Sequence, residues 1–192
     1  MDRSTKIYWA IIVILLSCSI FFYIKVHHKT GSLKKATAKL ENGDIVHLHK
    51  VVDGDTIIVR KNTDEQIMIR IVGIKSFDEG SKSDETTPYM KAAVHALNSF
   101  ASEKPIRVLL HSATKDKHGR VLATIFSGDQ DIALKLISHG LVLVYTKYPF
   151  PAMSLYLQQQ EIARANGVGL WANKDAASRA GFMIQKWQDE GQ

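Results

Sequence analysis

The sequence predicts an α+β chain, mostly β, built as a five-stranded barrel with about three helices and preceded by an N-terminal transmembrane helix. Three observations predict this. Five short segments are rich in β-branched residues and alternate apolar with polar side chains. Apolar stripes at helical spacing lie between and after these segments. An uncharged apolar run stands near the N-terminus.

The apolar run covers residues 7–24 and holds no charged side chain. A helix of about 18 residues is about 27 Å long, close to the thickness of a bilayer core. Tyr8, Trp9 and Tyr23 suit its two ends, because aromatic side chains favour membrane interfaces. No small-residue cleavage site follows, which favours an uncleaved anchor over a signal peptide. We expect a single-pass signal-anchor after a short tail at residues 1–6.

Basic residues gather beside this run. Residues 1–40 hold seven Lys or Arg against one Asp, which accounts for the net charge of +6, because the rest of the chain holds eighteen basic and eighteen acidic residues. The basic polar linker at residues 25–40 therefore suits anionic lipid headgroups. Net charge gives no support to a polyanionic substrate, so only the local arrangement of residues can indicate one.

The domain expected at residues 41–173 begins with a three-stranded meander. Its strands are expected at Ile45–Val52, Thr56–Arg60 and Gln66–Ile74. Turn-forming residues at Asp53–Gly54 and Lys61–Asp64 separate them.

Helices and two further strands follow the meander. Pro88 favours the start of a helix that runs to about Ala101. The remaining elements are strands at Ile106–His111 and Val121–Phe126 and helices at Ile132–Ser138 and Met153–Asn166. Five strands with helices inserted indicate a Greek-key barrel of the OB type. Residues 174–192 form a tail with a weak helical pattern, to which the sequence assigns no role.

Cysteine and histidine give little support to a metal site. Cys18 is the only cysteine, so the chain can form neither an intrachain disulfide nor a cysteine-based metal site. His47 and His49 alternate onto one strand face, where solvent-facing polarity explains them better than metal binding.

Five motifs carry a family resemblance by their order and spacing. They are Val52–Thr56, Arg70–Ile74, Asp116–Arg120, Gly140–Leu141 leading to Val144–Tyr145 and Tyr148, and Glu161–Arg164 leading to Gly169–Trp171. With them the chain resembles the staphylococcal nuclease, or thermonuclease, family over about residues 45–171. The resemblance implies a five-stranded OB barrel with three helices. It also implies calcium-dependent hydrolysis of phosphodiester bonds in DNA and RNA, with single strands preferred.

The reaction implied by the resemblance sets requirements that particular residues meet. Phosphodiester hydrolysis needs positive charge on the phosphate oxygens and an oriented water. Arg70 and Arg120 suit the first need, because a planar guanidinium can hold two phosphate oxygens and stays charged. The resemblance implies Asp55 as a Ca²⁺ ligand, and Lys117 and Tyr148 as nucleotide contacts.

The chain departs from the family pattern after the strand that carries Arg70. Lys75 stands where the family has an aspartate ligand, Ser76 where a backbone carbonyl is donated to the metal, and Asp78 where the catalytic glutamate stands. Lys75 removes a negative ligand and adds a positive charge beside Asp55, which weakens a calcium site. Asp78 is one methylene shorter than glutamate, and a misplacement of about 1 Å can cost about 100-fold in rate.

Three functions stay open on this sequence. The first is a membrane-tethered nuclease, weak or with a rearranged metal site, in which Asp78 orients or deprotonates water. The second is a catalytically inactive nucleic-acid-binding module on the same barrel. The third is a structural or adaptor domain at the membrane. We favour the enzyme and expect a monomer.

The side of the membrane on which the domain lies also stays open. Five basic residues after the apolar run against two before it favour a cytoplasmic domain. A short basic N-terminus ahead of an apolar run resembles an export signal instead. We expect an extracytoplasmic domain, because a nuclease that faces the chromosome is hazardous to the cell.

Overall fold

The computed structural model describes residue 2 and residues 40–61, 65–77 and 85–190. The expected anchor at residues 7–24, the basic linker up to residue 39, the turn at residues 62–64 and the candidate site residue Asp78 lie outside the described residues. Among the helices that are described, none is long and apolar enough to cross a membrane.

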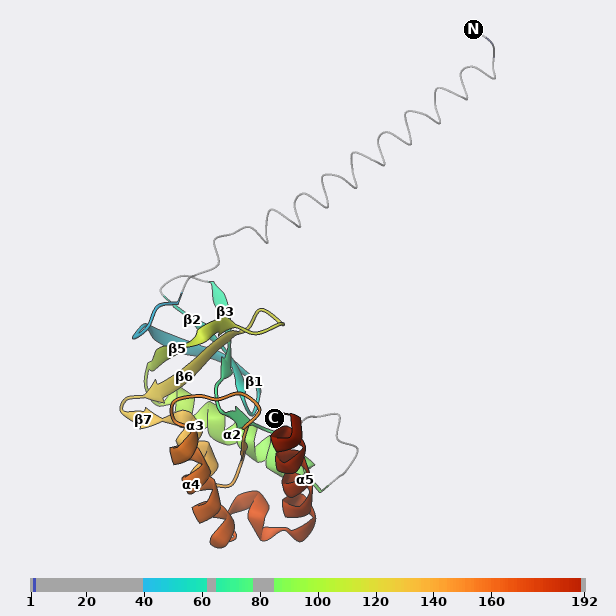
Figure 1. Cartoon of the computed structure of the whole chain (residues 1–192). Helices are drawn as coiled ribbons and strands as arrows, with labels where there is room; N and C mark the ends of the chain where they lie inside the picture. Colours follow the sequence, from blue (N-terminus) through green and yellow to red (C-terminus); the bar gives the residue numbers. More distant parts are fainter. Residues whose placement is uncertain (1, 3–39, 62–64, 78–84, 191–192) are drawn as a thin grey trace. The chain divides into compact units, whose positions relative to one another are not determined.

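Five strands close into a barrel, which confirms the mixed α+β class with a five-stranded barrel. An antiparallel meander is formed by β1 (Ile45–Asp53), β2 (Thr56–Arg60) and β3 (Gln66–Ile71), and a hairpin by β5 (Ile106–Lys115) and β6 (Val121–Ser127). The order is β3-β2-β1-β5-β6, and a parallel pairing of β3 with β6 closes it (Figure 1). Closure leaves no open edge among these strands.

The barrel interior is filled by side chains that alternate along each strand. Ile57 and Val59 on β2, Ile67 and Ile69 on β3, and Ala123 and Ile125 on β6 are all buried. Their neighbours on the strands are more exposed in most places, as the two-residue period of a strand requires. The alternation that predicted these strands is therefore the pattern that builds the core.

Four α-helices are described, rather than about three, and they gather at one end of the barrel (Figure 1). They are α2 (Thr87–Ser102), α3 (Ile132–Ser138), α4 (Met153–Ala165) and α5 (Lys174–Glu190), with a 3₁₀ turn, η1 (Gly169–Ala172), before the last. Pro88 lies in the first turn of α2, as its fixed φ favours. The carboxylate of Asp131 in β7 (Gln130–Asp131) accepts the N–H of Leu134 and so begins α3.

One predicted strand is shorter in the structure. The strand expected at Gln66–Ile74 ends at Ile71, and a turn at Gly73, with φ +80°, separates it from β4 (Ile74–Lys75). The ring of Phe150 packs so closely on Gly73 that a Cβ there would lie 2.5 Å from it. The continuous apolar run concealed this turn, because nothing but the glycine signals it. β4 then pairs with β8 (Leu143–Val144) in a separate ribbon.

A second buried cluster lies apart from the barrel core. We call it the second core. Its buried members come from the segment after β4, from β8, α4 and η1, and from α5: Phe77, Leu143, Ala163, Leu170, Trp171, Ala176, Ala180 and Trp187. The tail that the sequence left without a role therefore supplies three of the buried side chains of this cluster.

The close packing around Gly54 leads to a first testable prediction. A Cβ at Gly54 would lie 2.7 Å from the Cβ of Ser76 and 2.8 Å from that of Ala93. We expect Gly54→Ala to lower the free energy of unfolding, measured by urea denaturation, by about 1–3 kcal/mol through overpacking. Gly181→Ala is the control, because nothing lies within 4 Å of Gly181. In helix α5 it is expected to stabilise the chain by about 0.5–1 kcal/mol. Equal stabilities of Gly54→Ala and the unmodified chain would contradict the close approach.

Candidate functional site

Asp55 is the buried centre of the candidate site, with 1% of its surface exposed. Its Oδ1 accepts the hydroxyl of Thr56 at 2.9 Å and lies 3.2 Å from Nε of Arg70. Its Oδ2 accepts the N–H of Ser76 at 3.0 Å and lies 3.8 Å from Nζ of Lys75. Both carboxylate oxygens therefore face donors from three separate strands or strand ends.

The pKa values of Asp53 and Asp55, the two carboxylates at the β1–β2 turn, shift in opposite directions. Burial alone would raise the pKa of Asp55, but the charges of Arg70 and Lys75 outweigh it and hold the pKa below its ordinary value. Burial, and then the charge of Asp55, raise the pKa of Asp53. Asp53 Oδ1 also accepts the N–H of Asp55 at 2.9 Å, the turn chemistry expected of aspartate. Asp55 is thus the carboxylate that stays ionised, and Asp53 the one that takes a proton more easily.

Arg70 braces the turn that follows its own strand. It pairs across the sheet with Thr56, and its side chain is 10% exposed. Its Nη1 donates to the carbonyl oxygens of Asp55 at 3.3 Å and Ile71 at 2.6 Å, and its Nη2 to that of Ile74 at 2.5 Å. The guanidinium therefore holds the β3–β4 turn in addition to neutralising the buried carboxylate. Its backbone contacts could not be read from the sequence.

Arg120 reaches the same threonine from the start of β6. Its Nη1 donates to Oγ1 of Thr56 at 3.3 Å. Its Nε and backbone N–H donate to Asp116 at 2.7 and 3.0 Å, across the turn that Gly119 makes with φ +78°. Burial opposes ionisation of Asp116, but the hydrogen bonds from Arg120 lower its pKa. The Arg120 side chain is 26% exposed, so it is more open to a phosphate from solvent than Arg70.

The expected nucleotide contacts lie on exposed segments. Lys117 belongs to the β5–β6 turn that also carries Arg120, and its residue is exposed. Tyr148, after β8, is 63% exposed and packs edge-on to Tyr145, with ring centroids 6.0 Å apart. Burial raises the pKa of Tyr145, opposed by the positive charges of Lys147 and Arg70. Tyr145 thus contacts Tyr148 and lies within the electrostatic influence of Arg70.

The donor set around Asp55 does not fit a calcium ion. Calcium takes about six to eight oxygen ligands, whereas the oxygens of Asp55 face two cationic side chains and an N–H. Ser76, expected to offer its carbonyl oxygen to a metal, donates its N–H to Asp55. Within the described ranges no group of three or more His, Cys, Asp or Glu could hold a metal. His47 and His49 are exposed on β1, as expected.

Sequence reasoning missed the parts that connect the site. Thr56 joins the guanidinium of Arg120 to the carboxylate that Arg70 contacts directly, and Asp116 orients Arg120. The signals were the Asp-Gly-Asp-Thr turn and the four-residue spacing of Asp116 and Arg120, but neither shows which strands the barrel brings together.

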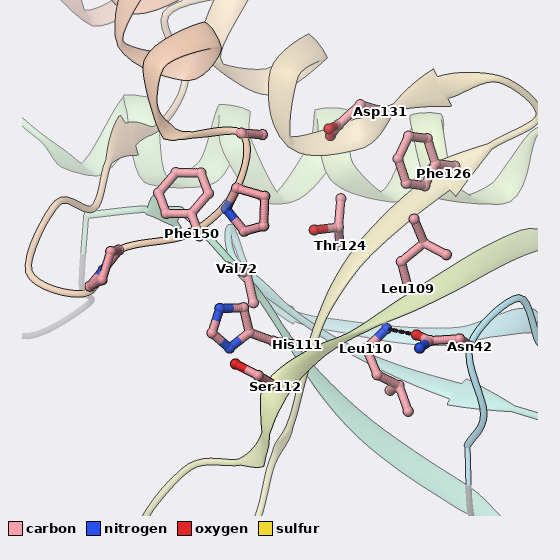
Figure 2. A pocket seen from close by; sticks show the side chains of 13 residues that line it. Asn42, Val72, Leu109, Leu110, His111, Ser112, Thr124, Phe126, Asp131 and Phe150 are labelled. Atoms are coloured by element: carbon pink, nitrogen blue, oxygen red, sulfur yellow. Dashed lines mark hydrogen bonds between the residues drawn. The ribbon is translucent and has the colours of Figure 1, made fainter.

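A groove of about 860 Å³ lies elsewhere, between the β5–β6 hairpin and the segment at residues 149–152 (Figure 2). Val72, Leu109, Phe126 and Phe150 make much of its lining. Among the described residues no Lys or Arg lines it, and the one carboxylate in its described lining, Asp131, accepts hydrogen bonds from Leu134 and Tyr156. The described lining therefore offers no positive charge to hold a phosphate.

The charge balance around Asp55 predicts a response to pH. The pKa of Asp55 is lower in the folded chain than in the unfolded chain. The ionised carboxylate therefore stabilises the fold at pH values above the ordinary carboxyl pKa of about 3.9. This stabilisation is lost as the pH falls through the pKa that Asp55 has in the folded chain. Lys75→Met removes one of the charges that lower this pKa. We expect acid unfolding of Lys75→Met, followed by circular dichroism, to begin at a higher pH.

Lys61→Met is the matched control for this experiment. Lys61 Nζ lies 2.6 Å from Asp44 Oδ2, but the Asp44 side chain is 18% exposed against 1% for Asp55. Exposed ion pairs contribute little to stability, so the shift is expected to be smaller than for Lys75→Met. Equal shifts in the two variants would contradict a special role for the buried carboxylate.

Comparisons with known proteins match the sequence of the chain to a family. A family model described as "Staphylococcal nuclease homologue" matches residues 68–173. The chain is 27% identical over 162 residues to a thermonuclease of Staphylococcus intermedius, covering 84% of this chain and 94% of that protein. It is 32% identical over 130 residues to an uncharacterized endonuclease of Haemophilus influenzae, covering 66% of this chain and 65% of that protein. A thermonuclease of Staphylococcus hyicus is 25% identical over 163 residues. Because the family model spans more than half of the chain, the chain belongs to the staphylococcal nuclease homologue family.

Proposed function

We propose that the chain is a nuclease-type hydrolase that cleaves phosphodiester bonds in DNA or RNA, single strands preferred. The observation that carries the proposal is the convergence on Thr56. Its hydroxyl lies 2.9 Å from the ionised carboxylate of Asp55 and 3.3 Å from Nη1 of Arg120. Arg70 holds the same carboxylate. Relatives named thermonuclease and endonuclease support a nuclease reaction.

The residues divide the chemistry as follows. Arg120, the more exposed guanidinium, binds nonbridging phosphate oxygens and stabilises the charge that develops on them. Arg70 keeps Asp55 and the β3–β4 turn in place. Asp78 orients or deprotonates the attacking water, while Lys117 and Tyr148 hold the flanking nucleotide by charge and stacking. Lys75, 25% exposed, adds positive charge at the edge of the site.

The proposal includes a calcium site that Lys75 weakens. In the relatives' family the reaction depends on Ca²⁺ in general, but here the ammonium of Lys75 lies 3.8 Å from the carboxylate that a calcium ion needs. Like charges at such a distance repel by roughly 1 kcal/mol in water and by several times that near a protein surface. Calcium therefore contributes little to this chain as it stands.

A second function, nucleic-acid binding without cleavage, is favoured by the cationic side chains around Asp55. The ion pairs of Asp55 with Arg70 and Lys75 leave a positively charged phosphate site whether or not water is activated. The assay below separates the two functions, and a chain that neither binds nor cleaves nucleic acid would support the structural or adaptor role instead.

The main test is cleavage and binding of a single-stranded DNA oligonucleotide by the full chain in detergent, with added calcium and with chelator. We expect cleavage that chelator reduces only slightly. Arg120→Ala is expected to lower the rate about 100-fold, because it removes charge stabilisation from the phosphate oxygens. Arg107→Ala is the charge-matched control, since Arg107 stacks on Phe126 and takes no part in the site. Equal losses in both variants would mean that only net charge matters.

The second test restores the calcium pattern of the family. Lys75→Asp combined with Asp78→Glu is expected to raise calcium-dependent cleavage by at least about tenfold, because charged ligands set calcium affinity and the longer carboxylate reaches the water. Lys61→Asp combined with Asp78→Glu is the control for added negative charge. An unchanged rate of calcium-dependent cleavage in the first double variant would contradict the proposal that Lys75 displaces calcium.

We further propose that the enzyme is a monomer tethered to a membrane through residues 7–24, with residues 25–39 against anionic headgroups and the domain extracytoplasmic. The uncharged run and the basic residues after it support the tether. A reporter fused after Gln192, active on only one side of the membrane, tests the orientation. Activity on the cytoplasmic side alone would reverse it.

A further inference from the structure

Helix α5 begins where the match to the family model ends. The model matches residues 68–173, and α5 runs from Lys174 to Glu190. Ala176, Ala180 and Trp187 are buried, and their spacing of four and seven residues puts them on one face of the helix. Phe182 is 61% exposed. The helix is therefore amphipathic, and its apolar face is occupied by this chain's own residues.

That face packs on the segment that leads to Tyr148. The rings of Trp187 and Tyr145 meet edge to face, with centroids 4.9 Å apart and planes at 84°. At the end of the same helix, Glu190 Oε2 lies 2.7 Å from Nζ of Lys147. Two contacts, one apolar and one ionic, thus fix α5 to the residues between β8 and Tyr148.

The β4–β8 ribbon needs such support. Each of its strands has two residues, paired as Ile74 with Val144 and Lys75 with Leu143. Two-stranded ribbons are marginal without packing on their faces, and this one is far shorter than an average strand pair. Ile74 and Val144 belong to the barrel core. Leu143 belongs to the second core with Trp187, and so does Phe77, which lies two residues after β4.

The site has an arginine half, with Arg70 and Arg120, and a ribbon half, with Lys75, and different parts of the fold support them. Arg70 and Arg120 lie on or beside β3 and β6, whose parallel pairing closes the barrel. Lys75 lies on the ribbon. The N–H of Ser76 donates to Asp55 Oδ2 and so ties the ribbon to the β1–β2 turn, and the N–H of Tyr145 donates to the carbonyl oxygen of Gly73 in the β3–β4 turn. The barrel supports the arginine half, and α5 packs against the segments that form the ribbon half.

We propose that α5, through Trp187, is a positioning element that holds the Lys75–Phe77 segment and the Tyr145–Tyr148 segment against the arginine half of the site. One consequence of this inference rests on the proposed function: the loss of α5 weakens the binding of nucleic acid. Trp187 touches no substrate and acts through Tyr145 and the second core.

Backbone hydrogen exchange of the full chain in detergent tests the proposal. In Trp187→Ala the N–H groups of Ser76 and Tyr145 are expected to exchange at least about tenfold faster, while those of Ile57 and Ile69 in the barrel keep their rates. Affinity for a single-stranded oligonucleotide falls in parallel. Trp187→Phe, which keeps an aromatic edge contact, restores both. Phe182→Ala, on the exposed side of the same helix, changes neither.

Each outcome decides the proposal. Unchanged exchange at Ser76 and Tyr145 would overturn it, as would an equal acceleration of every amide, because α5 would then add only general stability. Trp187→Leu, which fills the second core without a ring, replaces Trp187→Ala if that variant does not fold, and the same two amides are compared. A full chain that binds no oligonucleotide refutes the proposed function, whereas the exchange rates still decide the role of α5.

Discussion

The site is organised by one constraint: the ionised carboxylate of Asp55 is buried and must be neutralised. An unpaired charge in that position would cost several kcal/mol. The chain meets the constraint with groups from β3, from β4 and the residue after it, and from the start of β2, namely Arg70, Lys75, Ser76 and Thr56. Each of these groups ties its own element to the β1–β2 turn. The charge therefore determines how the strand ends meet around the site.

The same constraint gives Arg70 two tasks. Its hydrogen bonds to the carbonyl oxygens of Asp55, Ile71 and Ile74 brace the backbone, so the guanidinium serves the fold before it serves a ligand. Arg120 has a different balance, because Asp116 and Thr56 orient it while a quarter of its side chain stays open. The sequence motifs predict the same role for both arginines. The structure separates them, because Arg70 is 10% exposed and Arg120, at 26%, is the more accessible guanidinium.

How much the sequence predicted depends on whether the signal was local. Alternating apolar residues predicted the barrel strands, and Pro88 predicted the start of α2, because burial periodicity and φ preference are properties of short segments. The β4–β8 ribbon was missed, since two residues carry no period. The motifs placed Asp55, Arg70 and Arg120 among the candidates, but the role of Thr56 as the link between Asp55 and Arg120 depends on the β2–β3 register and the β3–β6 pairing. Such pairings join residues far apart in the sequence and leave no local trace.

The parallel pairing of β3 with β6 has a consequence for the order in which the protein becomes competent. It joins Arg70 to Leu122, residues separated by a long loop whose closure is entropically costly and therefore late in folding. Arg70 lies on β3 and Arg120 directly precedes β6, so this pairing brings their segments together. A chain still emerging from the ribosome therefore carries both arginines before they can be arranged around Asp55 and Thr56. The arrangement can form only after synthesis has passed β6.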